Sequence, residues 1–180
     1  GGYHLLVAIA DVAYYVRPES PLDKEAYERG NSTYFPDRVL PMLPEKLSND
    51  LCSLRPDGPR ATLAVHMWID KTGKLLRHSF VRGLMLSRAR LTYEQVQAAR
   101  EGNPDETTRP IMENVIEPLY AAWKILDAAR VERGALDLDI PERKIVVDDA
   151  GRMTGVAVRE RLDSHRLIEE FMVLANVAAA

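Results

Sequence analysis

The 180-residue sequence contains only one cysteine and has no surplus of positive charge. The single Cys52 rules out an internal disulfide framework and a metal site built from several cysteines. A net charge of −3 is not typical of a nucleic-acid-binding protein, although a local basic groove can lie on an acidic protein. The apolar run FMVLANVAAA is far too short to span a membrane. We therefore expect a reducing, cytoplasmic setting and no membrane partner.

Several common catalytic motifs are also missing. The sequence has no glycine-rich phosphate loop, no His-Glu-x-x-His pair and no nucleophile elbow. Cys52 has leucines close on both sides and no histidine nearby in the sequence, so a buried structural thiol is favoured over a nucleophile. Six dispersed arginines could line a phosphate path, but a charged surface explains them more simply: Arg29, Arg38, Arg55, Arg60, Arg88 and Arg90.

The composition is that of an ordinary globular protein, with 46% hydrophobic and 28% charged residues. A chain of this length can bury a real core, either as one domain or as a piece of a larger one. The sequence begins almost directly in an apparent strand and stops inside an apparent helix. We therefore expect residues 1–180 to be a single domain fragment, cut from a longer protein.

The periodicity of the sequence predicts a mixed α+β fold, with a mainly antiparallel sheet and packed helices. A nearly continuous apolar run predicts a buried strand over 4–12. The Thr-x-x-Gln spacing of Thr92 and Gln95 predicts a helix start, and Pro118 should kink or split a later helix. The other predicted elements are helices over 19–30, 91–102, 108–134 and 163–180, and hairpins over 59–87 and 143–160.

The stretch NSTYFPDRVLPMLPEKLSNDLCSL, residues 31–54, fits neither a helix nor a strand pattern. Pro36, Pro41 and Pro44 keep its backbone irregular, yet it is rich in apolar side chains. A flexible loop has no use for such apolar content. The sequence therefore predicts a shaped, packed loop that presents something.

Polar residues in apolar surroundings are candidates for a site. Asp11 ends the first strand, where a satisfied turn or edge carboxylate is favoured over a functional group. The final helix, capped by Asp163 or Ser164, is predicted to be buried on most sides beyond Glu170. His165, Glu169 and Asn176 share one stripe of this helix, which faces solvent, a polar network or a ligand.

Two tyrosines, Tyr34 and Tyr93, lie where a helix and an irregular segment meet. A tyrosine offers a flat face for stacking and a hydroxyl for hydrogen bonding. From the sequence pattern alone, a core or rim position is favoured for each over a functional role.

The segments VAIADV, YVRPESPLDKEAYERG, STYFPDRVLPMLPEKLSNDLCSL, RARLTY and HRLIEEFMVLAN, in this order, resemble the catalytic domain of the ribonuclease II / ribonuclease R family. The bacterial ribonuclease R branch is the most similar. The resemblance implies a processive 3′-to-5′ exoribonuclease that hydrolyses single-stranded RNA to nucleoside 5′-monophosphates. It also implies Mg²⁺ in the parent enzyme, held by a cluster of aspartates.

The resemblance also implies roles for individual residues. Tyr34 matches the tyrosine that packs against the 3′-terminal nucleotides and sets the length of the final product. Tyr93 matches a tyrosine that contacts the ribose near the cleavage point, and Glu169 matches a glutamate that prefers RNA over DNA. Leu138 aligns loosely with an aromatic base clamp, which a leucine cannot reproduce. Asp11 matches no metal ligand of the family.

The sequence departs from the family pattern at both ends. The aspartate cluster is expected just ahead of GGYHLLVAIADV, and an arginine-bearing segment is expected downstream; neither is present. We therefore expect this central fragment to bind no Mg²⁺ and to be inactive by itself. The alternative is a non-catalytic RNA-binding or scaffolding module with the same core. The sequence does not give the oligomeric state.

Overall fold

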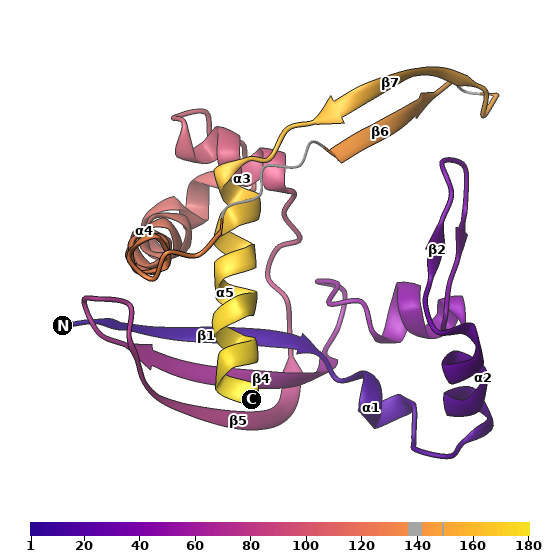
Figure 1. The fold of residues 1–180 in the computed structure, drawn as a ribbon, viewed down its shortest axis with the longest axis horizontal. Coiled ribbons are helices and arrows are strands. Elements are labelled where there is room, and N and C mark those ends of the chain that lie inside the picture. Colours follow the sequence, from indigo (N-terminus) through magenta and orange to yellow (C-terminus); the bar gives the residue numbers. More distant parts are fainter. Residues whose placement is uncertain (137–141, 149) are drawn as a thin grey trace.

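A three-stranded antiparallel sheet forms the centre of the molecule in the computed structural model, which describes residues 1–136, 142–148 and 150–180 (Figure 1). Its strand order is β1–β4–β5, so β1 lies at an edge and pairs with β4, the first strand of a hairpin that is distant in the sequence. The strands are β1 (Tyr3–Ala10), β4 (Arg60–Ile69) and β5 (Leu75–Met85).

The turn between β4 and β5 lies where the sequence predicted it. The Asp70 carboxylate accepts hydrogen bonds from the Thr72 amide at 2.8 Å, the Thr72 hydroxyl at 2.7 Å and the Lys74 amide at 3.1 Å. These hydrogen bonds hold the pKa of Asp70 below its usual range, and the two from Thr72 contribute most. Gly73 has a φ of 81°, a left-handed conformation that glycine adopts without strain. The predicted hairpin is therefore confirmed.

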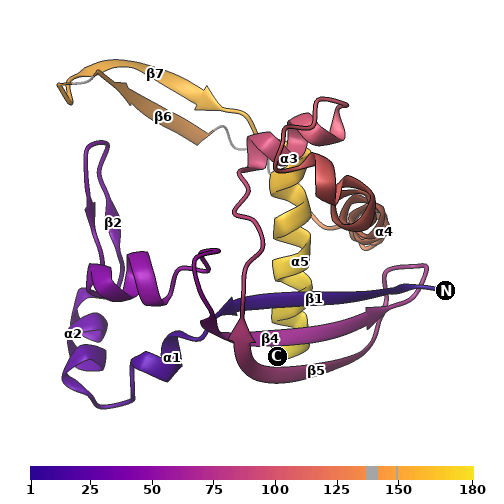
Figure 2. The same cartoon turned by 180° about the vertical axis from the view of Figure 1, so that it is seen from behind.

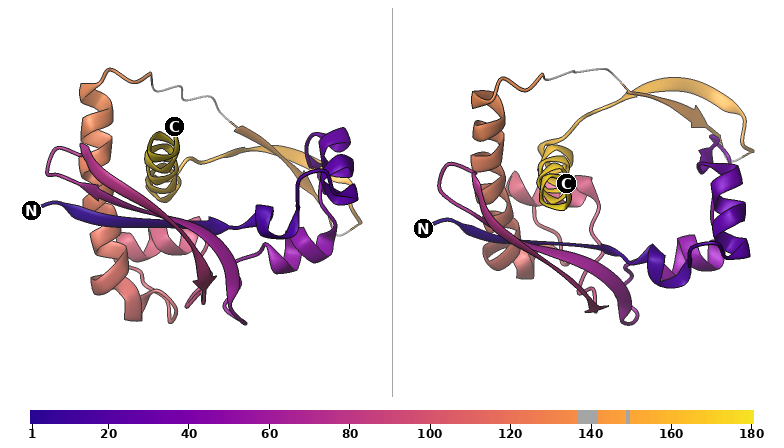
Figure 3. Two further views of the ribbon diagram at one scale, coloured as in Figure 1. Left: turned by 90° about the horizontal axis from the view of Figure 1, so that it is seen from below. Right: turned by 60° about the horizontal axis from the view of Figure 1, so that its bottom comes forward.

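Helix α5 (Asp163–Ala179) packs on one face of this sheet, and α4 (Glu117–Glu132) and α3 (Tyr93–Arg100) pack against α5. Figure 1 shows α5 crossing the sheet, and Figure 3 shows α5 nearly end-on, with α4 beside it. The core fills the space between them; its most buried members are Met67, Ala99, Ile116 and Ala122. Within the described ranges, no helix is long and apolar enough to cross a membrane.

Pro118 divides the predicted helix over 108–134. A short 3₁₀ turn, η2 (Arg109–Ile111), and a π-helical turn, η3 (Met112–Ile116), precede the regular helix. Pro118 lies in the first turn of α4, where its missing amide hydrogen costs nothing. The predicted split is therefore confirmed.

Two predictions of burial are wrong. In β1, Leu6 and Ile9 are 57% and 44% exposed, because the helices cover only one face of this edge strand. In α5, Met172, Val173 and Val177 are exposed, because only the side of this helix facing the sheet and its neighbouring helices is covered. An apolar sequence predicts that a face can be buried, whereas the neighbouring chain segments decide whether it is.

The predicted cap of α5 is also wrong. Leu162, rather than Asp163 or Ser164, occupies the N-cap position. The Nδ1 atom of His165 accepts a hydrogen bond from the Leu162 amide at 3.2 Å. The imidazole thus takes the part that a glutamate or glutamine plays at the third position of a capping box.

Residues 12–59 form an arm that leaves the sheet after β1 and returns at β4 (Figure 2). Its short hairpin is mostly exposed: Tyr34 is 76% exposed and Leu40 is 52% exposed. The expectation of a packed loop is therefore wrong for the hairpin, although Leu47 further along is buried. The elements of the arm are α1 (Val12–Tyr15), α2 (Pro21–Arg29), β2 (Thr33–Tyr34), β3 (Val39–Leu40) and η1 (Lys46–Leu51).

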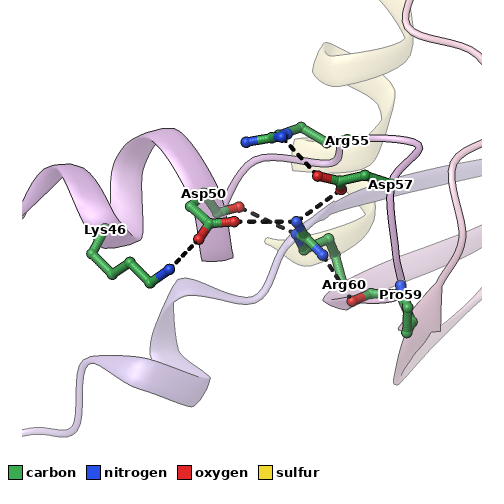
Figure 4. A network of polar contacts seen from close by, with 6 residues as sticks. All are labelled: Lys46, Asp50, Arg55, Asp57, Pro59 and Arg60. Carbon is green, nitrogen blue, oxygen red and sulfur yellow. Dashed lines mark hydrogen bonds and ion pairs between the residues drawn. The ribbon is translucent and has the colours of Figure 1, made fainter.

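A network around Arg60 joins the end of the arm to the sheet (Figure 4). The Arg60 guanidinium forms ion pairs with Asp50 of η1 at 3.2 Å and with Asp57 at 2.9 Å. Lys46 pairs with Asp50 at 2.6 Å, and its hydrogen bond is the main reason that the pKa of Asp50 lies below its usual range. Because Arg60 begins β4, this network holds η1 against the start of that central strand.

A second hairpin consists of β6 (Glu142–Val147) and β7 (Met153–Arg159), which pair with each other as predicted. The views in Figures 1 and 2 agree that it projects away from the main sheet, over the side where the arm lies. Asp148 accepts hydrogen bonds from the amides of Ala150 and Arg152 at the turn. Asp149, which was expected in this turn, lies outside the described residues.

The sheet face opposite the helices carries an exposed row of stacked side chains. The His4 and Trp68 rings lie parallel, with their centroids 4.3 Å apart. The Arg77 guanidinium carbon lies 3.8 Å from the centroid of the Trp68 ring. A hydrogen bond of 2.9 Å joins His4 Nε2 to His66 Nδ1. This row links all three strands through cross-strand pairs.

Candidate functional site

The start of α3 places Tyr93. The Thr92 hydroxyl accepts a hydrogen bond from the Gln95 amide at 3.2 Å, and the Gln95 side chain accepts one from the Thr92 amide at 2.9 Å. This reciprocal pair is the predicted capping box, and it satisfies two amides that the helix leaves free. Tyr93 is therefore the first residue of a well-fixed helix, with 38% of its surface exposed.

The ring of His165 packs flat against Tyr93. The two ring centroids are 4.1 Å apart, and the ring planes differ by 19°. His165 lies in the first turn of α5, so this stack joins the starts of two helices that are far apart in the sequence.

Gln97 provides a second link at the same junction. Its side-chain oxygen accepts hydrogen bonds from the Ser164 amide at 3.2 Å and from the Tyr120 hydroxyl at 3.3 Å. Gln97 thus connects α3 with both α5 and α4. Burial raises the pKa of Tyr120, so its hydroxyl stays protonated and remains a donor.

Glu169 lies one helical turn after His165 on α5, and half of its side chain is exposed. Its carboxylate accepts a hydrogen bond from the Arg161 guanidinium, with which it forms an ion pair. The junction therefore presents a tyrosine ring and a carboxylate that an arginine orients.

An apolar pocket of about 280 Å³ opens beside Tyr93, between α3, α4 and α5. The Ser164 hydroxyl, which lines it, is buried and has no hydrogen-bond partner among the described residues. A buried hydroxyl of this kind can accept or donate a hydrogen bond to a group that enters the pocket. Other side chains of the pocket wall are Leu91, Val96, Leu119 and Ile168.

Tyr34 lies elsewhere, on the exposed hairpin of the arm. It pairs with Val39 across β2 and β3, and the Phe35 amide donates to the Arg38 carbonyl at 2.8 Å in the turn beyond. The hairpin stands apart from α3 and α5 in both Figure 1 and Figure 2. The structure therefore places Tyr93 against His165, one helical turn before Glu169 on α5, and does not bring Tyr34 beside them.

The remaining candidates have structural explanations. Asp11 is 5% exposed and pairs with Arg82 at 3.0 Å, as expected of a satisfied carboxylate at the end of a strand. Cys52 is half-buried, and burial raises the pKa of its thiol, which opposes nucleophilic reactivity. Asn176 lies exposed near the end of α5. Leu138, expected in place of an aromatic clamp, lies outside the described residues.

The described part of the chain contains no group of three or more His, Cys, Asp or Glu side chains that could hold a metal ion. The donor sets present therefore do not fit a Mg²⁺ site, which requires several oxygen ligands in near-octahedral geometry.

Sequence reasoning missed Gln97 and Arg161. The signal for Gln97 was its spacing from Tyr93, since residues four apart lie on the same face of a helix. Arg161 gave no comparable signal, because it precedes the helix that carries its partner Glu169.

The sequence matches known proteins over its whole length. The RNB domain family matches residues 1–180. Ribonuclease R of Vibrio parahaemolyticus is 46% identical over 182 residues, which cover 100% of this chain and 22% of the relative. Ribonuclease R of Escherichia coli is 45% identical with the same coverage. The chain thus spans 22% of the length of these curated relatives.

The fold also matches solved structures. Mycoplasma genitalium RNase R, in complex with ribose methylated single-stranded RNA, superimposes with a TM-score of 0.86 and 34% identity, over 96% of this chain and 27% of that one. The yeast pseudonuclease Ssd1 superimposes with a TM-score of 0.70 and 18% identity, over 98% of this chain and 21% of that one. The α+β class predicted from the sequence is therefore confirmed.

Proposed function

The chain belongs to the RNB domain family, and on that premise we propose that it forms the central part of the catalytic domain of a processive 3′-to-5′ exoribonuclease. The substrate would be single-stranded RNA, released as nucleoside 5′-monophosphates. The observation that carries this proposal is the match to ribonuclease R along the entire chain at 46% identity. The RNA bound to the Mycoplasma genitalium relative supports RNA as the partner.

We assign recognition of the sugar to Tyr93 and Glu169. A carboxylate accepts several hydrogen bonds at once, so Glu169 can keep its bond from Arg161 and accept another from a ribose 2′-hydroxyl. DNA lacks this hydroxyl and would leave that acceptor site unused. The exposed part of the Tyr93 ring offers a surface against which the ribose packs.

We assign the end of the RNA to Tyr34. Its ring is largely exposed, so a nucleobase can reach it without displacing core side chains. Stacking of a base on an aromatic ring contributes about 1–3 kcal/mol. In this arrangement Tyr34 would hold the last nucleotides and so set the length of the final product.

The metal chemistry of the parent enzyme belongs, in this proposal, to residues outside these 180. We propose that Mg²⁺ assists hydrolysis in the full-length protein, that the 180-residue segment alone is inactive, and that the protein acts in the cytoplasm. No step of the proposed recognition by Tyr34, Tyr93 and Glu169 depends on the metal.

Fluorescence anisotropy with labelled single-stranded RNA tests the proposal. Tyr34→Ala should weaken binding about 5- to 150-fold, the range that corresponds to the loss of one stacked base. Tyr93→Ala should also weaken binding, because it removes the surface against which the ribose packs. Tyr27→Ala is the matched control, since Tyr27 is an 87% exposed tyrosine on α2 with no assigned contact to RNA. Equal affinities in wild type and both variants would contradict the stacking roles.

The alternative is a non-catalytic RNA-binding or scaffolding module. The pseudonuclease Ssd1 shares the fold, so the fold by itself does not determine catalysis. Incubation of labelled RNA and Mg²⁺ with the full-length protein separates the two, because only the enzyme shortens the RNA stepwise. The same incubation with the 180-residue chain should leave the RNA intact, and stepwise shortening would refute its proposed inactivity.

A further inference from the structure

His165 lies between the two residues assigned to sugar recognition. We infer that it is a positioning residue, which sets the preference for RNA over DNA by holding the Tyr93 ring in place through the stack. This inference rests on the proposed function. It concerns the flat surface of the imidazole, and it assigns His165 no contact with the RNA.

The hydrogen bonding of His165 explains why its ring surface is the relevant feature. The Nδ1 atom accepts from the Leu162 amide, so in the neutral imidazole the proton is on Nε2. That Nε2 atom is buried and has no hydrogen-bond partner among the described residues. Neither nitrogen is therefore presented to a ligand at the surface, whereas the ring face lies against Tyr93.

The hydrogen bond to Leu162 fixes the imidazole at the first turn of α5. The Tyr93 ring on α3 stacks on this fixed imidazole, which restricts where the tyrosine ring can lie. Glu169 follows four residues later on the same helix face, a rise of about 6 Å along the axis. His165 thus sets the position of the tyrosine ring relative to the carboxylate. Recognition of one hydroxyl group requires both to be placed within about 0.5 Å.

A second contact keeps the junction intact when the stack is removed. The Gln97 side chain binds the Ser164 amide and the Tyr120 hydroxyl independently of the imidazole. Variants of His165 should therefore retain the packing of α3 against α5. The effect of losing the ring can then be measured on a folded protein.

Two variants separate the ring of His165 from its capping bond. His165→Gln keeps an acceptor for the Leu162 amide, as glutamine does at this position of a capping box, and removes the ring. His165→Phe keeps a flat ring and removes the acceptor. The readout is the ratio of the dissociation constants for single-stranded DNA and RNA of the same sequence, measured by anisotropy on the 180-residue chain. Chemical denaturation of each variant reports stability separately.

We expect His165→Gln to lower this ratio about tenfold or more, the range for one hydrogen bond to a charged group. His165→Phe should keep the ratio within about twofold of wild type, even though losing the capping bond makes it the less stable variant. A low ratio in His165→Phe, or an unchanged ratio in His165→Gln, would overturn the inference.

Tyr93→Ala and Glu169→Gln distinguish failure of this inference from failure of the proposed function. If both lose the preference for RNA while His165→Gln keeps it, only the positioning role is wrong. If the wild-type chain shows no preference, or if these two variants keep it, the proposed sugar recognition is wrong and the inference fails with it.

Discussion

The helix-covered sheet and the arm (residues 12–59) are both rich in apolar side chains, yet they bury them very differently. Met67 and Ile116 in the covered sheet are almost fully buried, whereas Tyr34 and Leu40 on the arm are largely exposed. Tyr93 and Glu169 lie on helices that pack against that core. Tyr34 lies instead in a short hairpin, in a strand of only two residues. This difference agrees with the roles proposed for the two regions. Recognition of one ribose hydroxyl by Tyr93 and Glu169 requires fixed geometry, whereas stacking of a terminal RNA base on Tyr34 tolerates a mobile base.

We expect the largest difference between the two regions in the free energy of unfolding, when a leucine is replaced by alanine in each. Leu126→Ala in α4 should lower the free energy of unfolding by about 2–5 kcal/mol, because it leaves a cavity at a 4% exposed position. Leu40→Ala in β3 should change it by less than about 0.5 kcal/mol. Chemical denaturation monitored by circular dichroism measures both. Similar losses in the two variants would mean that the arm packs as tightly as the core.

A smaller effect concerns a polar contact within the packed region. The buried Thr108 hydroxyl donates to the Asp105 carboxylate at 2.7 Å and accepts from the Asp105 amide at 2.9 Å. The bond from the Thr108 hydroxyl is the main reason that the pKa of Asp105 lies below its usual range, and a bond from the Thr108 amide lowers it further. Thr108→Val should lower the free energy of unfolding by about 1 kcal/mol at pH 7.

The sign of the pH dependence follows from the lowered pKa of Asp105. A carboxylate with a lowered pKa stabilises the folded state above its ordinary value of about 3.9, and this contribution disappears as the pH falls through the folded-state pKa. Denaturation curves recorded from pH 7 down to about pH 3 should therefore show the deficit of Thr108→Val shrinking below about pH 4. A deficit that stays constant with pH would show that Thr108 does not stabilise the Asp105 carboxylate.

Features that depend on neighbouring residues in the sequence were predictable. The β4–β5 hairpin follows from alternation and a Thr-Gly turn, and the start of α3 follows from Thr92 and Gln95. The split before α4 follows from the shape of Pro118. Each of these features is determined by a few residues that are close in the sequence. A single sequence is therefore sufficient to predict it.

Burial was predicted less well, because it depends on segments that are distant in the sequence. The apolar pattern of β1 is the same whether one face or both faces are covered, and here only one is. The same holds for α5 and for the hairpin around Tyr34. Cys52 was predicted to be a buried thiol, and the structure leaves it half-buried.

The candidate site was only partly accessible from the sequence. Tyr93 and Glu169 were named through the family resemblance, and their assigned roles stay predictions. The stack of His165 on Tyr93 depends on the packing of α3 against α5, which no local pattern encodes. The bond from the Ser164 amide to Gln97 spans 67 residues and was invisible for the same reason.

The central claim is that RNA binds at the junction of α3 and α5, which carries Tyr93 and Glu169, and reaches the arm at Tyr34. Chemical-shift mapping by NMR, with a short single-stranded RNA added to the 180-residue chain, tests it most directly. The claim predicts that the amides around these three residues shift together as RNA is added. Shifts confined to the opposite face of the sheet, around the stacked His4 and Trp68, would contradict it.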